Sequence, residues 1–153
     1  MRRLQRILVL VGTLSALSTF AGSGRVIKVL PHLLDKEGRH TLSPSLYERD
    51  AYQARLREHP ENRSGMRFDV HWKTRGSVYG TLRVIVELRG IAEGNLPRQL
   101  VLEEKVRPSG AFSHWTTVFL RGNRYQQFGE VTAWRVSLWE DDELLGEQTS
   151  FLW

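Results

Sequence analysis

The sequence of 153 residues predicts an all-β fold, an antiparallel sandwich of two sheets with about seven strands. Two observations support this prediction. Apolar residues alternate with polar ones along several segments, which is the pattern of strands that have one buried and one solvated face. Clusters of Gly, Pro, Asn and Asp separate these segments, and about seven short strands with such spacing favour a two-sheet sandwich.

Residues 1–21 are predicted to be a signal peptide that precedes the fold. Three arginines come before an uncharged, mostly apolar run over residues 7–21. This run is short for a membrane-spanning helix, which needs about 20 apolar residues. The small residues Thr19 and Ala21 suit a cleavage site, so we expect cleavage after Ala21 and a single mature domain over residues 22–153. Retention of the segment as a membrane anchor is the alternative.

Charge and cysteine content narrow the class of protein. The formal net charge is +5, and it falls to +2 once the three arginines of residues 1–21 are removed, because that segment holds no acid. No run of five like charges occurs, so we expect no binding of nucleic acid. Cysteine is absent, which excludes disulfides, thiol catalysis and cysteine-based zinc sites. The exported domain must therefore depend on its hydrophobic core.

The first predicted strand covers residues 25–30 and ends at Pro31, since proline cannot donate to a strand ladder. Residues 32–65 are polar and rich in turn formers, and we interpret them as an insertion after this strand. Ser45 and Glu48 have the spacing of a capping box and predict a short helix over residues 46–58, ended by His59-Pro60. The helical spacing places four residues on one face: Tyr47, Ala51, Tyr52 and Leu56.

Six further strands are predicted after the insertion. Alternation of apolar and polar residues is clearest at residues 68–73, 82–88 and 134–139. Less regular apolar runs at residues 100–106, 115–120 and 144–152 complete the set. Trp72 and Trp134 fall on the apolar faces of their strands, so we expect both in the core.

Residues 134–151 carry a resemblance to a known class of domain. An aromatic-led strand from Trp134 reaches an acidic turn at Asp141-Asp142, and a second strand ends in Phe151. This segment resembles the closing hairpin of bacterial immunoglobulin-like or fibronectin-like sandwich domains. The resemblance implies an immunoglobulin-like sandwich, although the chain lacks the disulfide cysteines of true immunoglobulin domains. It implies no functional residues, because such sandwiches host unrelated roles.

The sequence contains no recognisable catalytic or metal-binding motif. Its five histidines form neither H-x-H nor H-E-x-x-H. Asp35, Glu37 and His40 are close enough in sequence to meet a metal ion, but solvated loop residues are the more common explanation. His71 and His114 lie on predicted strands and could share an outer face if those strands were neighbours, although ordinary surface histidines are the favoured interpretation. We expect no enzymatic activity and no cofactor.

Two sets of residues are candidates for binding a partner. Ile85, Arg135 and Trp139 point away from the predicted core, and exposed apolar groups of this size mark partner surfaces. The alternative is that residues 32–65 fold over that sheet face and bury it. Tyr47 and Tyr52 form the second candidate, because tyrosine is enriched at protein interfaces. The alternative is that the helix packs on the domain through these two tyrosines.

The sequence therefore predicts a secreted or periplasmic, non-catalytic binding or structural module. Its partner would be another envelope protein or an extracellular ligand, and contact with a membrane is expected only through an uncleaved signal segment. Two alternatives remain. A small outer-membrane β-barrel would also show period-two strands and a terminal aromatic residue such as Trp153. An extracytoplasmic enzyme would require a concave pocket that brings ionisable groups together.

Overall fold

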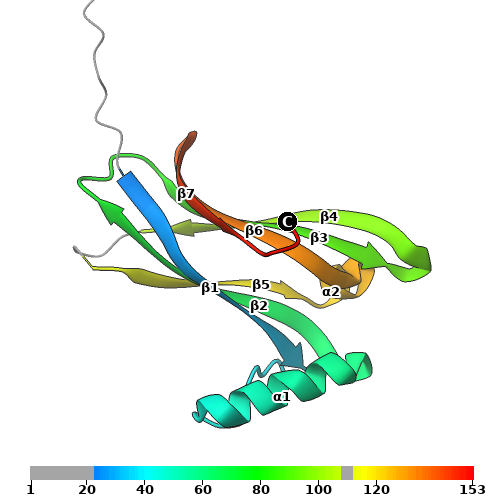
Figure 1. Ribbon diagram of the computed structural model, residues 1–153. Helices are drawn as coiled ribbons and strands as arrows, with labels where there is room; N and C mark the ends of the chain where they lie inside the picture. The colour runs from blue at the N-terminus through cyan, green and yellow to red at the C-terminus, as the bar shows by residue number, and fades with distance from the viewer. Residues whose placement is uncertain (1–22, 108–111) are drawn as a thin grey trace, which may run out of the picture.

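The computed structural model describes residues 23–107 and 112–153, so the predicted signal peptide lies outside the described residues. The described chain forms two antiparallel sheets, which face each other as two layers (Figure 1). One sheet has the strand order β1 (Ser23–Asp35), β2 (Arg63–Arg75) and β5 (His114–Arg121). The other has the order β4 (Leu96–Val106), β3 (Leu82–Ala92), β6 (Glu130–Glu140) and β7 (Glu143–Thr149). The prediction of an all-β, two-sheet sandwich is confirmed.

The core lies between the two sheets and is built from every second residue of their strands. Its fully buried members on the central strands are Phe68, Val70, Trp72, Leu82, Val84, Val86, Leu88, Val136 and Leu138. Trp72 is only 1% exposed, and its indole Nε1 donates a hydrogen bond of 2.8 Å to Thr116 Oγ1. Trp134 is partly buried and packs against the same core. The alternation seen in the sequence thus marks the buried face correctly.

Strand β1 continues through Pro31 to Asp35, so the prediction that it ends at Pro31 was wrong. Within its sheet β1 is an edge strand that pairs only with β2. Leu33 donates its backbone N–H to Gln53, away from β2. Position 31 has the same orientation, so the missing N–H of Pro31 faces outward and removes no ladder hydrogen bond. The connection between β1 and β2 therefore covers residues 36–62 rather than 32–65.

A β-bulge in β1 changes which side chains face outward. Val26 pairs with Trp72 and Lys28 pairs with His71, which leaves Ile27 as an extra residue without a partner. Because of this bulge, Arg25 and Lys28 lie on the same outer face although they are three residues apart.

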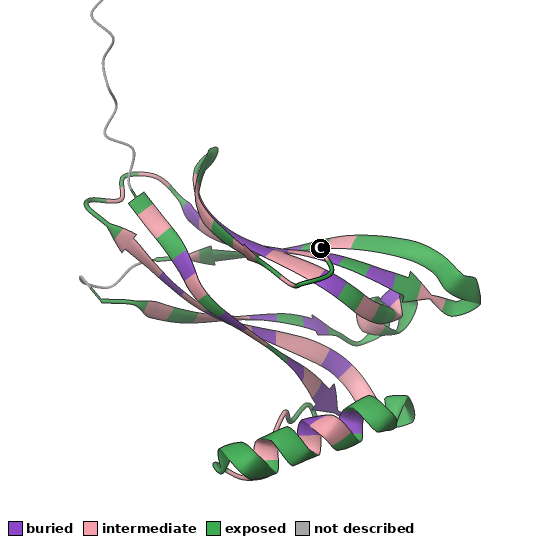
Figure 2. Ribbon diagram, viewed as in Figure 1, coloured by how far each residue is buried: buried purple, intermediate pink, exposed green. Residues whose placement is uncertain are grey.

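Helix α1 (Leu46–Glu58) begins and ends where the sequence predicts. Ser45 is the N-cap, and its Oγ accepts a hydrogen bond from the backbone N–H of Glu48 at 3.5 Å. The helix is exposed along most of its length and buried only where it meets the end of β1 (Figure 2). Its buried residues are Gln53 and Leu56. The predicted apolar face was therefore wrong for Tyr47 and Ala51, which are exposed, because polar Gln53 occupies the centre of the true contact face.

Helix α2 (Asn123–Phe128) was not predicted, since Gly122-Asn123 indicated a simple turn. Its last residue, Phe128, is 5% exposed and belongs to the core. Short 3-10 turns at Pro60–Asn62 and Glu93–Asn95 precede β2 and β4.

Strand β7 ends at Thr149, so the predicted last strand was too long and Phe151 is fully exposed beyond it. Among the helices of the described ranges, none is both long and apolar enough to cross a bilayer.

Candidate binding face on the three-stranded sheet

The outer face of the β1–β2–β5 sheet changes character along its length. Helix α1 lies against one end of it (Figure 1). Polar side chains form a connected network in the middle. At the other end, where β1 begins and β2 ends, the face is open and rich in positive charge. The charged groups of the covered end and of the middle are bound by other residues of the protein, whereas the cations of the open end have no acidic partner among the described residues.

At the covered end, Asp35 fixes α1 to the sheet. Its carboxylate accepts a hydrogen bond of 2.6 Å from the Tyr52 hydroxyl and one of 2.8 Å from Arg39 Nε. Burial alone would raise the pKa of Asp35, but these hydrogen bonds outweigh it and hold the pKa below its usual value. Leu34 and Leu56 are 0% and 3% exposed at this end. The residues here hold the helix in place.

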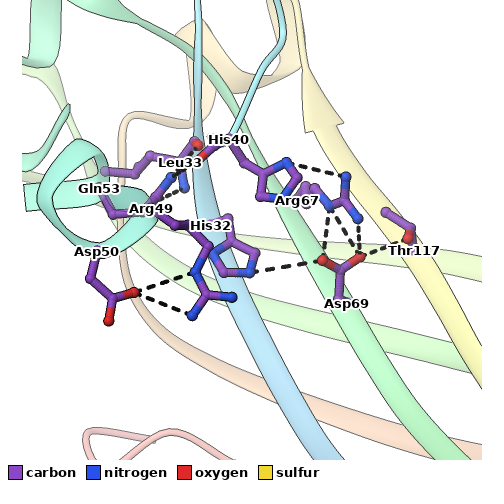
Figure 3. A network of polar contacts seen from close by, with 9 residues as sticks. All are labelled: His32, Leu33, His40, Arg49, Asp50, Gln53, Arg67, Asp69 and Thr117. Atoms are coloured by element: carbon purple, nitrogen blue, oxygen red, sulfur yellow. Dashed lines mark hydrogen bonds and ion pairs between the residues drawn. The ribbon is translucent and has the colours of Figure 1, made fainter. Parts of the chain in front are cut away.

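In the middle of the face, Asp69 is the centre of a polar network (Figure 3). Arg67 donates to its two oxygens at 2.9 Å from Nε and 2.8 Å from Nη2, and Thr117 Oγ1 donates at 2.7 Å. Burial raises the pKa of Asp69, and the hydrogen bonds from Arg67 and Thr117 lower it to a net value below the usual one. The carboxylate is therefore ionised and fully occupied by its neighbours.

Two histidines extend this network. His32 Nε2 lies 3.8 Å from Asp69 Oδ2, and the ring of His32 lies 5.1 Å from that of His40. Burial is the main reason that the pKa of His32 falls to about 4, and the nearby His40 adds to the effect. The pKa of His40 is also lowered, first by burial and then by the charge of Arg67. Both rings are thus neutral at neutral pH.

The open end carries a cluster that we call the basic face, made of Arg25, Lys28, His71, Lys73, Arg75 and Trp115. The strand register brings these residues together: Arg25 pairs with Lys73, and His71 pairs with both Lys28 and Trp115. The rings of His71 and Trp115 stack with centroids 4.6 Å apart and planes 4° from parallel. Trp115 remains 54% exposed. An exposed aromatic ring and four cationic side chains therefore share this face of the sheet.

The four cations of the basic face form no ion pair with any acidic residue that the structure describes. The charge of Arg25 is the main cause of a lowered pKa at Lys73, followed by burial and the charge of Arg75. Ser23, Gly24 and these three residues line a shallow pocket of about 180 Å³. The cations repel one another and lack a counter-charge, so a negatively charged group placed here would be attracted by all of them.

The sequence-predicted surface of Ile85, Arg135 and Trp139 does lie on one outer face, that of the four-stranded sheet. Helix α1 does not cover it, because the helix lies against β1 instead. Trp153 covers part of it, since its ring lies 4.1 Å from the guanidinium of Arg89 and 5.0 Å from that of Arg135. Arg135 also pairs with Glu87 at 2.6 Å. The charge of Arg135 is therefore already compensated within the protein.

The two predicted tyrosines have different environments. Tyr52 is partly buried and its hydroxyl is used by Asp35, which raises the pKa of Tyr52 together with burial, the larger cause. Tyr47 is 83% exposed at the start of α1. The structure does not bring them together on one surface, and Tyr52 serves to attach the helix.

His71 and His114 do not share an outer face, although β2 and β5 are indeed neighbours. His71 stacks on Trp115 on the outer face, whereas His114 lies 4.9 Å from the Trp72 ring on the inner side. His114 pairs with Trp72, the residue that follows His71 on β2, and successive strand residues point to opposite faces, so His71 and His114 lie on opposite faces of the sheet. Asp35 and Glu37 both bind Arg39 instead of meeting His40 around a common point. Within residues 23–107 and 112–153, no group of three or more His, Asp or Glu side chains is arranged to hold a metal ion.

Comparisons with known proteins returned no match: no family model fits the chain, and no curated protein or solved structure is similar to it.

Proposed function

We propose that this protein is an exported, non-catalytic binding module that holds an acidic ligand on the basic face. The observation that carries the proposal is the set of four cations, Arg25, Lys28, Lys73 and Arg75, without an acidic partner among the described residues, beside the exposed ring of Trp115. Cations that are not paired within the protein are available to a ligand, and an aromatic ring beside them adds apolar contact area.

The use of the other ionisable groups supports binding rather than catalysis. Asp35 and Asp69 are fully engaged by Arg, Tyr and Thr donors. His32 and His40 belong to the same internal network, and His71 faces the Trp115 ring. A catalytic acid or base must reach its substrate, and these groups are held by other protein side chains.

The order of segments in the sequence is compatible with export. All described strands follow residue 22, so they lie after the apolar run of residues 7–21 and the expected cleavage point at Ala21. Cleavage there would leave every strand of the sandwich intact. The predicted leader is therefore compatible with a folded domain that starts at residue 22.

The strand order also supports an immunoglobulin-like arrangement. Taken in chain order, the pairing of β2 with β5, of β3 with β6 and of β6 with β7 corresponds to the B–E, C–F and F–G pairs of immunoglobulin sandwiches. Strand β4 joins the sheet of β3, β6 and β7, as the additional C′ strand of variable domains does. This arrangement agrees with the resemblance of the closing hairpin.

Binding to a soluble polyanion tests the proposed function. Dextran sulfate and neutral dextran are the probes, and affinity is measured at several salt concentrations. We expect binding of dextran sulfate that weakens as salt rises, and no binding of neutral dextran. The double substitution Lys73→Gln/Arg75→Gln should weaken binding at least tenfold. Equal affinity for both dextrans would overturn the proposal. Export is checked separately by fractionation and by the N-terminal residue of the exported chain, which should be Gly22.

A further inference from the structure

We infer that the acidic ligand of the basic face is the surface of an anionic phospholipid membrane. This inference rests on the proposed function and names its ligand. Three features of the described residues favour a lipid surface over a soluble acidic molecule: the openness of the face, the type of aromatic residue on it, and the end of the domain at which it lies.

The openness of the face favours a large, flat ligand. Three of its cations, Arg25, Lys73 and Arg75, line a shallow pocket of about 180 Å³ together with Ser23 and Gly24. Pockets that enclose small molecules measure about 300–1,000 Å³. The cations instead follow the strands: Lys73 and Arg75 are two residues apart on β2, which places them about 7 Å from each other. Such a row of charges suits a surface that carries many headgroups.

The aromatic residues are of the type that prefers the boundary between lipid and water. Trp115 presents 54% of its surface, and Phe112, which precedes β5 by two residues, presents 81%. Tryptophan is enriched at the headgroup level of membranes, where its ring contacts apolar chains and its N–H stays hydrated. The four cations on the same sheet face as Trp115 correspond to the size of basic cluster that binds anionic lipids.

The position of the basic face agrees with the course of the chain. Arg25 is the third residue of β1, and Arg75 is the last residue of β2, so both lie at the end of the domain where the chain enters the sandwich. In the sequence this entry follows the apolar run of residues 7–21 directly. The basic face therefore lies at the end of the domain that is nearest in sequence to this apolar run.

Vesicle binding of the full chain tests the inference. Partitioning is measured on vesicles of phosphatidylcholine alone and on vesicles with 30% phosphatidylglycerol, at about 0.1 M salt. Residues 1–21 are the same in every variant, so their contribution cancels in the comparison. We expect tighter binding to the anionic vesicles, and Lys73→Gln/Arg75→Gln should reduce it by about 30-fold. The matched control Arg98→Gln/Arg124→Gln removes two exposed cations near the opposite end and should change binding less than threefold.

A second measurement addresses contact of Trp115 with lipid. Brominated acyl chains quench tryptophan fluorescence on contact, so the wild-type protein should lose emission on anionic brominated vesicles. Trp115→Phe should remove most of that quenching while circular dichroism stays unchanged. Equal quenching in both proteins would overturn the inference. Binding of dextran sulfate without preference for anionic vesicles would also overturn it and would leave the proposed function standing, whereas loss of both kinds of binding would end both proposals.

Discussion

Gln53 completes the free edge of β1 at Leu33. Its Oε1 accepts a hydrogen bond of 2.8 Å from the Leu33 N–H, and its Nε2 donates one of 2.9 Å to the Leu33 carbonyl. A second hydrogen bond from Nε2 reaches the His40 carbonyl at 2.8 Å. One buried amide side chain thus takes the place of a neighbouring strand and joins α1, β1 and the loop after β1. The helix that the sequence predicts as an inserted element is in this way part of the sheet's edge.

Replacement of Gln53 tests this relationship. Gln53→Ala leaves the Leu33 N–H and carbonyl without partners, so we expect a loss of about 2 kcal/mol in the free energy of unfolding. Urea denaturation measures the loss, and amide hydrogen exchange at Leu33 should become faster. Arg55→Ala, an exposed change on the same helix, should stay within about 0.5 kcal/mol. Equal effects of the two substitutions would show that the amide does not support the edge.

Stability should rise with pH between about 4 and 6.5 because of His32. Its pKa is about 4 in the folded protein and about 6.5 in the unfolded chain, so the unfolded state binds more protons within that window. Above pH 6.5 His32 does not change the free energy of unfolding with pH. By pH 4 the free energy of unfolding is lower by up to about 3 kcal/mol. Denaturation midpoints at several pH values measure the slope. His32→Gln should flatten it, and an unchanged slope in this variant would assign the effect to other groups.

Two tryptophans should differ in their contribution to stability. Trp72 is 1% exposed and its Nε1 is hydrogen-bonded, so Trp72→Ala should cost about 4 kcal/mol. Trp134 is only partly buried, and Trp134→Ala should cost about 2 kcal/mol because less apolar surface is lost. Chemical denaturation of the two variants provides the comparison. A larger loss for Trp134 would place the centre of the core closer to β6 than the structure does.

Gly129 ends α2 in a conformation that a side chain would not tolerate. Its φ is 84° and its ψ is −145°, and a Cβ atom there would lie 2.3 Å from the Ile91 carbonyl oxygen. We expect Gly129→Ala to cost more than about 3 kcal/mol. Gly94 also has a positive φ, 76°, but nothing lies within 4 Å of its added Cβ, so Gly94→Ala should cost only about 1 kcal/mol. Melting curves of the two variants measure the difference, and equal losses would show that neither the clash nor the backbone conformation of Gly129 sets it apart from Gly94.

The features that depend on local chemistry were predictable from the sequence. Ser45, Glu48 and His59-Pro60 gave both ends of α1, because caps act within one turn of the helix. The alternation around Trp72 and Val84 predicted the buried face of the central strands, because successive residues of a strand point to opposite faces. Helix α2 escaped prediction because six residues that begin after a glycine show no helical period.

The basic face depended on contacts that no local pattern contains. Arg25 and Lys28 are three residues apart, which places them on opposite sides of a regular strand, and only the bulge at Ile27 brings them together. Their approach to Lys73 and Trp115 further required that β1 and β5 flank β2. A modest net charge concealed the cluster, since the acidic residues of the domain lie elsewhere. The different roles of Tyr52 and Tyr47 also depend on a non-local contact. Only Tyr52 lies close enough to Asp35 to form the hydrogen bond that holds α1 against β1.

Pro31 gives β1 a safeguard against self-association. The outward edge of a strand normally offers a ladder of donors and acceptors to which a second copy of the chain can add. In β1, Pro31 has no donor to offer and Leu33 is already occupied by Gln53, so two successive outward positions are closed to an incoming strand. Pro31→Val would restore a donor at the first of them. The residue that resembles a strand terminator in the sequence thus keeps neighbouring molecules from joining edge to edge.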